Sequence, residues 1–366
     1  LSLHDALPIY DRKDVKMKTL YLHIGTPKTA TSSIQKFLAE NWDVLQKHGY
    51  FFPESTHIYP RVNARRNAHF LSGRVRNGEG IRDKEKEKTY LEEGLQQVRD
   101  AFQNYDNVIL TDESIWYCLC YLKKSLLCDL KKEADKQGYQ IKVIVYLRRQ
   151  DKFLLSRWNQ RVKQKSTSDA VLSCDEYFEL TQKKEKDIYQ YGKILDGIAE
   201  VIGKENLIVR RFDVESWRDG SIIHDFMHEI GIDVTPEFHE LEKNANLSLD
   251  KNTTEIKRIL NQEESFTMKE ISYMGKFLKK ISENYIQKDH TEMLAKEELQ
   301  QFLKKYETEN ERIAREYIGD GQPLFSNEVK DLPKWNPQNE KMQEDRKSTR
   351  LNSSHHRIEY CVMFVK

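Results

Sequence analysis

One short stretch of the chain combines the residue types that bind phosphate-like anions. Residues 20–24 are an apolar run, and residues 25–35 follow as Gly-Thr-Pro-Lys-Thr-Ala-Thr-Ser-Ser-Ile-Gln. A strand that passes through a small-residue loop into a helix presents main-chain N–H groups and the helix dipole to an anion. Four threonines and serines follow the lysine, at positions 29 and 31–33, whereas an ordinary helix cap needs only one hydroxyl side chain. The candidate ligands are Thr26, Lys28, Thr29, Ala30, Thr31, Ser32 and Ser33.

This loop differs from the nucleotide-binding loop of P-loop NTPases, which reads GxxxxGK[ST]. No second glycine precedes Lys28, which comes three residues after Gly25, and Pro27 stands directly before the lysine. The hydroxyl residues all follow the lysine except Thr26. The loop is therefore predicted to hold an anion in a different arrangement from that of the NTPase loop.

A second anion-binding pair is predicted where another apolar run ends. Residues 141–147 run into Arg148-Arg149-Gln150-Asp151, and a helix that contains Ser156 is expected to start near Asp151. Arginine suits phosphate because its planar guanidinium donates two parallel hydrogen bonds. We expect Arg148 to bind the phosphate, with Arg149 as the alternative. The other interpretation is a surface arginine at a strand end that binds no ligand.

The order Pro-Lys-Thr-(Gly/Ala)-Thr-(Ser/Thr)-Ser at residues 27–33 resembles the 5′-phosphosulfate loop of sulfotransferases, which use 3′-phosphoadenosine 5′-phosphosulfate (PAPS). The family's second motif places an Arg at a strand end and a Ser eight residues later, where they hold the 3′-phosphate. Arg148 and Ser156 have this spacing. Residues 23–29 and 156–160 look like a bacterial subfamily, and the likeness covers roughly residues 19–261.

The resemblance implies a P-loop-like sulfotransferase fold and transfer of a sulfuryl group from PAPS to an acceptor hydroxyl or amine. It implies no metal, because Lys28 can supply the positive charge at the leaving phosphate. A glycan is the expected acceptor on resemblance alone, and small hydroxyl compounds remain open. The acceptor's identity and the oligomeric state are not readable from the sequence.

The reaction also needs a base to take the acceptor's proton. In the subfamily, a His in an Asn-x-His context lies near the acceptor, and Asn67-Ala68-His69 matches it. His69 is therefore the expected base. Glu113 competes, because it follows the apolar run 108–110 and so lies near the ligand edge of a parallel sheet. Residues 61, 65 and 66 are arginines that fit a solvated basic loop, with an anionic acceptor as the alternative partner.

Two other function classes stay open. The first is a kinase or NTPase with a degenerate P-loop, for which Asp112 and Glu113 would be Mg²⁺ ligands after an apolar strand. Magnesium-dependent turnover of ATP would favour it. The second is a non-catalytic nucleotide-binding module, which would bind PAPS without forming a sulfated product.

The elements that must position these residues follow an α/β pattern. Apolar runs at residues 20–24, 108–110, 141–147 and 207–209 are typical of buried parallel strands. Helical patterns separate them, including residues 187–201 and 221–230, so a parallel sheet flanked by helices is expected. Residues 251–261, 269–285 and 297–317 predict a helical extension. The expected layout is an α/β domain at 17–250, its extension at 251–318 and an irregular tail at 319–344.

Both ends of the sequence are expected to be artefacts. Residues 345–355 and 2–9 read as translations of a sequencing adapter pair, so residues 345–366 and 1–16 are set aside as adapter and leader, with Met17 as the expected start. Residues 1–9 and 345–366 together hold five basic and three acidic residues, and their removal lowers the formal net charge from +1 to −1. A nucleic-acid-coating protein is thus disfavoured. Few cysteines, no signal peptide and no apolar run of membrane-spanning length predict a cytoplasmic protein.

Overall fold

The computed structural model describes residues 17–60, 62–121, 124–165, 167–241, 249–263, 266–283 and 290–339. The segments interpreted as adapter sequence lie outside these residues. In the described part of the chain the strands form one five-stranded parallel sheet in the order β2-β3-β1-β4-β5. The strands are β1 (Thr19–His23), β2 (Tyr50–Phe51), β3 (Asn107–Thr111), β4 (Gln140–Leu147) and β5 (Leu207–Arg211). The four predicted strands are confirmed, whereas the two-residue β2 was not predicted.

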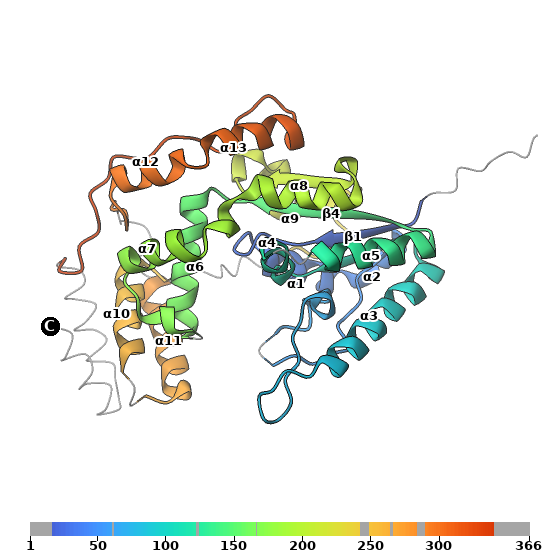
Figure 1. Cartoon of the computed structure of the whole chain (residues 1–366), viewed down its shortest axis with the longest axis horizontal. Helices are drawn as coiled ribbons and strands as arrows, with labels where there is room; N and C mark the ends of the chain where they lie inside the picture. Colours follow the sequence, from blue (N-terminus) through green and yellow to red (C-terminus); the bar gives the residue numbers. More distant parts are fainter. Residues whose placement is uncertain are drawn as a thin grey trace, which may run out of the picture.

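Helices cover both faces of the sheet (Figure 1). The residues of β1 alternate between the two faces, as a strand requires: Leu20 and Leu22 join one core and Tyr21 the other. The face of Tyr21 packs against α1 (Thr31–Glu40), α2 (Trp42–Lys47) and α9 (Ile222–Glu229). The opposite face packs against α3 (Lys84–Asn104), α4 (Ser114–Cys120), α5 (Lys124–Gln137) and α8 (Tyr191–Ile202). The predicted α/β class is therefore confirmed.

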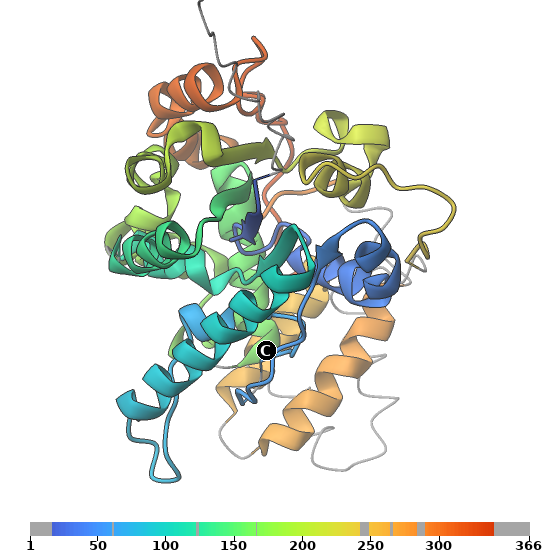
Figure 2. The ribbon, with the colours of Figure 1, turned by 90° about the vertical axis from the view of Figure 1, so that its right-hand side faces the viewer.

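The predicted helical extension is also present, but its parts pack in different places. Helices α10 (Lys251–Gln262) and α11 (Met268–Glu283) share a small separate core and lie beside α6 (Gln150–Gln164) and α7 (Cys174–Lys184), away from the sheet (Figures 1 and 2). Helices α12 (Lys296–Lys304) and α13 (Glu307–Ile313), followed by a π-helical turn (Ala314–Ile318), join the main core instead. None of the helices in the described residues combines the length and the apolar character needed to cross a membrane.

Two continuous helical patterns are interrupted in the structure. The apolar stripe that starts at Ile34 is divided between α1 and α2, because buried Asn41 stands at the junction and its amide exchanges hydrogen bonds with the main chain of His239. The pattern at 297–317 is likewise divided between α12 and α13, at Lys305 and Tyr306. In the first case the break coincides with a contact from a segment far away in the sequence.

Candidate functional site

A cleft of about 840 Å³ opens at the carboxyl ends of β1, β3 and β4. After β1 the chain adds β2 and β3 on one side of it, and then returns to add β4 and β5 on the other. Ligands of open parallel sheets bind at such a switch point. The cleft is lined by Pro27, Lys28, Ala30, Thr31, Ser32, Ser33, Arg66, Glu113, Ser114, Tyr117, Arg148, Ser156, Arg157, Asn159, Gln160, Arg161, Lys163 and Gln164.

The loop after β1 shapes an anion cradle. Lys28 and Ala30 have left-handed backbone conformations, with φ of 71° and 57°, and α1 begins directly after Ala30. Alternation of right- and left-handed residues turns successive N–H groups toward one side, which is how backbone nests bind anions. The main-chain hydrogen bonds of α1 begin at Ser33 and Ile34, both of which donate to the Ala30 carbonyl. The amides of Thr31 and Ser32 therefore precede the hydrogen-bonded turns and can serve a ligand.

The predicted hydroxyl ligands fall into two groups. Thr31, Ser32 and Ser33 line the cleft with Ala30. Thr26 and Thr29 are fully buried, and neither is among the lining residues. The Thr26 hydroxyl donates to the Tyr146 carbonyl at 3.1 Å, and the Thr29 hydroxyl donates to the Thr26 carbonyl at 2.6 Å. In the described structure these two side chains hold the loop against β4.

The Lys28 ammonium lies inside the cleft and donates to Gln160 Oε1 at 3.1 Å. Its pKa is lowered to about 8, mainly by burial and then by the positive charges of Lys163 and Arg148, while Glu113 opposes the shift. At pH 7 the amine is still mostly protonated. A cation held without a close counter-ion among other cations is electrostatically prepared for an anionic ligand.

The structure separates the two candidate arginines at the end of β4. Arg148 lines the cleft and donates to the Lys28 carbonyl at 2.9 Å, which joins the two predicted motifs. Burial lowers the pKa of Arg148. Arg149 turns away and forms a bidentate pair with Asp151, with both distances 2.8 Å, and donates to the carbonyls of Ser326 and Glu328 in the C-terminal tail. Ser156 lines the cleft from α6, two turns beyond Arg148.

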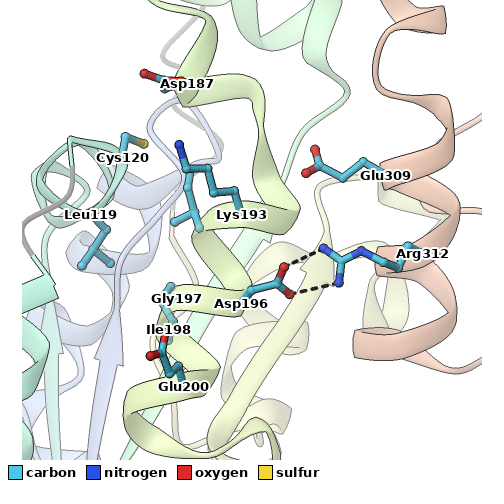
Figure 3. Close-up of a pocket in the computed structure, with 11 residues that line it drawn as sticks. Leu119, Cys120, Asp187, Lys193, Asp196, Gly197, Ile198, Glu200, Glu309 and Arg312 are labelled. Carbon is cyan, nitrogen blue, oxygen red and sulfur yellow. Dashed lines mark hydrogen bonds and ion pairs between the residues drawn. The ribbon is translucent and has the colours of Figure 1, made fainter.

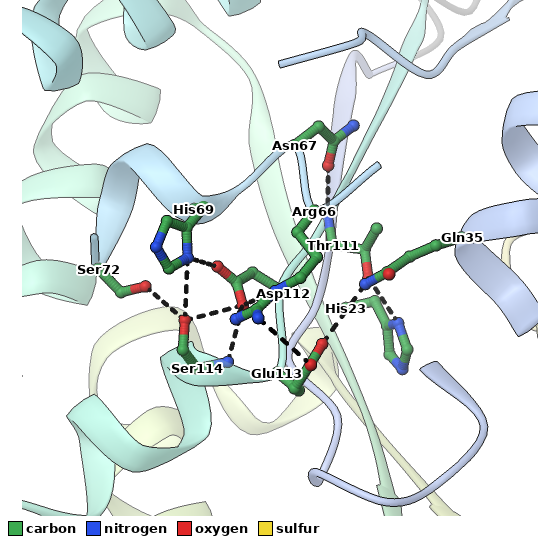
Figure 4. Close-up of polar contacts among 10 residues, drawn as sticks. All are labelled: His23, Gln35, Arg66, Asn67, His69, Ser72, Thr111, Asp112, Glu113 and Ser114. Atoms are coloured by element: carbon green, nitrogen blue, oxygen red, sulfur yellow. Dashed lines mark hydrogen bonds and ion pairs between the residues drawn. The ribbon is translucent and has the colours of Figure 1, made fainter. Parts of the chain in front are cut away.

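The end of β3 brings Glu113 to the cleft. Glu113 directly precedes α4, and its side chain is 22% exposed. Its carboxylate lies 3.5 Å from Gln35 Nε2 and 3.6 Å from Arg66 Nη1 (Figure 4). Since Lys28 approaches from the end of the neighbouring strand, an acceptor in the cleft could contact both side chains.

His69 belongs to a hydrogen-bond network behind Arg66 and Glu113, which form one wall of the cleft. Its Nδ1 lies 2.5 Å from Asp112 Oδ2 and 3.3 Å from Ser114 Oγ, and His69 is not among the residues that line the cleft (Figure 4). Asp112 is fully buried, and its other oxygen accepts from Arg66 and from Ser114. Burial opposes ionisation, but the hydrogen bond from His69 and the charge of Arg66 outweigh it, so the pKa of the Asp112 carboxyl lies below its usual range.

The Asn-x-His context has a structural explanation. The Asn67 amide donates to the carbonyls of Pro53 and Ile109 and accepts from the Thr111 N–H, so it fastens this loop to the end of β3. His69 then falls beside Asp112. The other two histidines near the sheet are occupied elsewhere: His57 stacks on Tyr90, and His23 is fully buried, where desolvation lowers its pKa to about 3.

The interpretation of Arg66 as part of a solvated loop is wrong. Its side chain is only 19% exposed and is paired with Asp112 and Glu113 at the cleft wall. Sequence reasoning also missed the outer lining residues of α6. Their spacing was a usable signal, because Ser156, Gln160 and Lys163 share one helical face at i, i+4 and i+7.

A second cavity of about 390 Å³ lies between α4, α8 and α13 and contains none of the predicted site residues (Figure 3). Its charged lining is mostly paired within the protein. Arg312 forms a bidentate contact with Asp196, at 3.0 and 2.8 Å, and Glu309 accepts from the amides of Gly192 and Lys193 at the start of α8. The predicted site residues that face a cavity thus gather in the cleft beside β1.

Comparison with known proteins gives limited similarity. No family model matches the chain. An uncharacterized protein of Archaeoglobus fulgidus is 29% identical over 180 residues, which is 49% of this chain and 46% of that protein, so the chain spans less than half of this relative's length. The crystal structure of a sulfotransferase from Alicyclobacillus acidocaldarius aligns with 61% of this chain and 86% of its own, at 17% identity and a TM-score of 0.36. At this level neither match assigns a family, and the functional argument rests on the cleft.

Proposed function

We propose that the protein transfers a sulfuryl group from PAPS to an acceptor hydroxyl or amine. One observation carries this proposal: the Lys28 loop and the Arg148–Ser156 pair, which come from adjacent parallel strands, line the same cleft. Their distance along the chain is about 120 residues, and Arg148 Nη1 nevertheless reaches the carbonyl of Lys28. A ligand with two separate phosphate groups suits two separate anion holders in one cleft.

In the proposed complex each motif has its own phosphate. Lys28, the amides of Thr31 and Ser32 and the hydroxyls of this turn would hold the 5′-phosphosulfate. Arg148 and Ser156 would hold the 3′-phosphate. The donor supplies an activated sulfuryl group, whose S–O bond to the 5′-phosphate breaks as the acceptor oxygen or nitrogen bonds to sulfur. The ammonium of Lys28 would stabilise the charge that develops on the leaving phosphate.

Glu113 is the proposed base. It lines the cleft, whereas His69 contacts Asp112 from behind the wall. A base must come within hydrogen-bond reach of the proton that it abstracts. His69 would then act through Asp112, as a positioning residue for Arg66 and hence for Glu113. Direct proton transfer to His69 is the alternative.

The acceptor is proposed to be hydrophilic, as expected for a glycan. The outer cleft presents amide and hydroxyl side chains from α6 and α4, including Gln160, Gln164 and Ser114, with Tyr117 as the aromatic surface. A sterol or a long lipid would need an apolar wall, because burial of polar groups without partners is costly. Sugars combine hydroxyls with an apolar ring face and so suit this lining.

Binding should discriminate 3′,5′-diphosphoadenosine from 5′-AMP. Charge-assisted contacts to one phosphate are each worth about 1.5–3 kcal/mol, so calorimetry should find at least roughly tenfold weaker binding of 5′-AMP. Arg148→Ala should remove the preference. Arg149→Ala is the matched control and should keep it, since that side chain contacts Asp151 and the tail. Equal affinity of the unmodified protein for both nucleotides would contradict the donor assignment.

Nucleotide affinity should also depend on pH. Lys28 in the free protein loses its proton as the pH rises through about 8, and a bound anion favours the ammonium form. Affinity should therefore be nearly constant below about pH 7, fall by about twofold between pH 7 and 8, and fall by up to about tenfold per pH unit well above 8. Calorimetry across this range tests it, and Lys28→Ala should flatten the profile. A fall that persists in this variant would assign the titration to another group.

The NTPase alternative finds little support in the geometry. Its expected Mg²⁺ ligand Asp112 is fully buried and already accepts hydrogen bonds from Arg66, His69 and Ser114. The non-catalytic alternative is tested by incubation with radiolabelled PAPS and a panel of glycans, small hydroxyl compounds and amines. Binding of PAPS without any labelled product would favour that alternative.

A further inference from the structure

The cleft extends along α6 beyond the two phosphate motifs. Ser156, Gln160 and Lys163 follow one face of the helix, and Gln160 is the residue that Lys28 contacts. Lys163 lies one helical turn past Gln160, a rise of about 5 Å. The outer end of the cleft therefore carries a cation that neither phosphate motif includes.

The cations of the cleft differ in their partners. Arg66 pairs with Asp112, Arg157 with Glu185 at 2.8 Å and Arg161 with Asp169 at 3.5 Å. Lys28, Arg148 and Lys163 have no carboxylate within ion-pairing distance among the described residues. Two of these three are assigned to the phosphates of the donor. Lys163 remains as an unpaired charge directed at the space left for the acceptor.

Further lysines increase the positive charge around Lys163. Its neighbour Lys279 comes from α11, and burial together with the charge of Lys279 lowers the pKa of Lys163. Beneath α6, the fully buried Lys257 donates to Asn261 and to the Val162 carbonyl, and its neighbour Lys165 donates to the Glu263 carbonyl. The buried Lys257 has partners inside the protein, so the added charge that favours an anion at Lys163 comes from Lys279.

We propose that Lys163, which lines the cleft beyond Gln160, forms an anion subsite for the acceptor, with Lys279 adding positive charge, and that the acceptor therefore carries a carboxylate, sulfate or phosphate group beside the hydroxyl or amine that reacts. This inference rests on the proposed function, because it takes Lys28 and Arg148 as occupied by the donor. The anionic group lies along α6 from Lys28, so it positions the acceptor and takes no part in the transfer. A neutral glycan would leave both lysines unpaired.

The test is calorimetry with protein saturated with 3′,5′-diphosphoadenosine. The probes are a hexasaccharide of alternating glucuronic acid and N-acetylglucosamine, neutral maltohexaose and N-acetylglucosamine 1-phosphate. The uronate hexasaccharide or the sugar phosphate should bind at least about tenfold more tightly than maltohexaose, and the stronger of the two identifies the anionic group. Lys163→Ala should weaken that binding by about tenfold or more, and Lys279→Ala should weaken it by a smaller factor, because Lys279 adds charge without lining the cleft. Lys152→Ala is the control, since this lysine of α6 pairs with Glu292 outside the cleft.

Three results would overturn the subsite. They are equal or undetectable binding of all three probes, anionic binding that survives both lysine substitutions, and a large loss of nucleotide affinity in Lys163→Ala, which would move Lys163 to the donor site. Failure of the proposed function has a different signature, namely nucleotide binding without preference for the 3′-phosphate. In that case the sugar titrations are repeated without nucleotide, and they still test whether Lys163 binds the anionic group.

Discussion

Replacement of Glu113 with Gln should lower kcat by about 10²–10⁴, the usual contribution of a general base. The carboxylate lines the cleft beside Lys28, and Gln keeps the size of the side chain, although its single amide oxygen can accept from only one of Gln35 and Arg66. Nucleotide affinity should stay within about twofold, because a base contacts the acceptor and not the donor. Turnover of radiolabelled PAPS and calorimetry with 3′,5′-diphosphoadenosine measure the two quantities.

His69→Ala is the informative comparison. If His69 acts through Asp112, this variant should lose less turnover than Glu113→Gln, and its nucleotide affinity should also be preserved. Near-normal turnover in Glu113→Gln together with a large loss in His69→Ala would give the role of base to His69. PAPS-dependent transfer would survive that result, but the assignment of Glu113 would not.

Replacement of Lys28 with Ala should lower kcat by about 10²–10³, the usual cost of removing one electrostatic donor from a transition state. The ammonium is buried in the cleft, and its charge matters most when the leaving oxygen becomes anionic. Nucleotide affinity should also fall, by a smaller factor, because the ground-state phosphosulfate is already charged. Single-turnover rates at saturating PAPS separate the two effects.

Lys36→Ala provides the matched control for Lys28→Ala. Lys36 lies on α1, the helix that directly follows the Lys28 loop, but its side chain is 35% exposed and faces Glu40 at 3.8 Å. This variant should keep both kcat and nucleotide affinity. Unchanged turnover in Lys28→Ala, with Lys36→Ala as reference, would remove the leaving-group role from Lys28.

Local pattern was sufficient to predict four of the five described strands and to place two candidate anion-binding motifs directly after two of them. Buried strands such as β4 are continuous apolar runs, and the residues directly after a parallel strand must lie at the ligand edge of the sheet. Lys28 and Arg148 could therefore be assigned to one site although they are far apart in sequence. Their meeting is a consequence of topology, because β1 and β4 are neighbours.

Side-chain partners depended on the tertiary structure. The spacing to Ser156 favours Arg148 over Arg149 but leaves both open, and the structure separates them, because Asp151 and the tail carbonyls of Ser326 and Glu328 hold Arg149 away from the cleft. In the same way, the loop that carries Arg66 is basic and polar in sequence, and it is folded inward because Asn67 bonds to the main chain at the end of β3.

The sequence by itself thus determined four of the five described strands, and which loops stand at the carboxyl edge of the sheet, because apolar periodicity and loop chemistry are local properties. Only the tertiary structure decided that Glu113 faces the cleft while His69 lies behind Asp112, and that Lys163 lines the same cleft as Lys28. His69 and Asp112 are 43 residues apart in the sequence, and Lys28 and Lys163 are 135 apart. Such pairs are set by how helices and loops pack on the sheet, and no pattern within either segment specifies its partner.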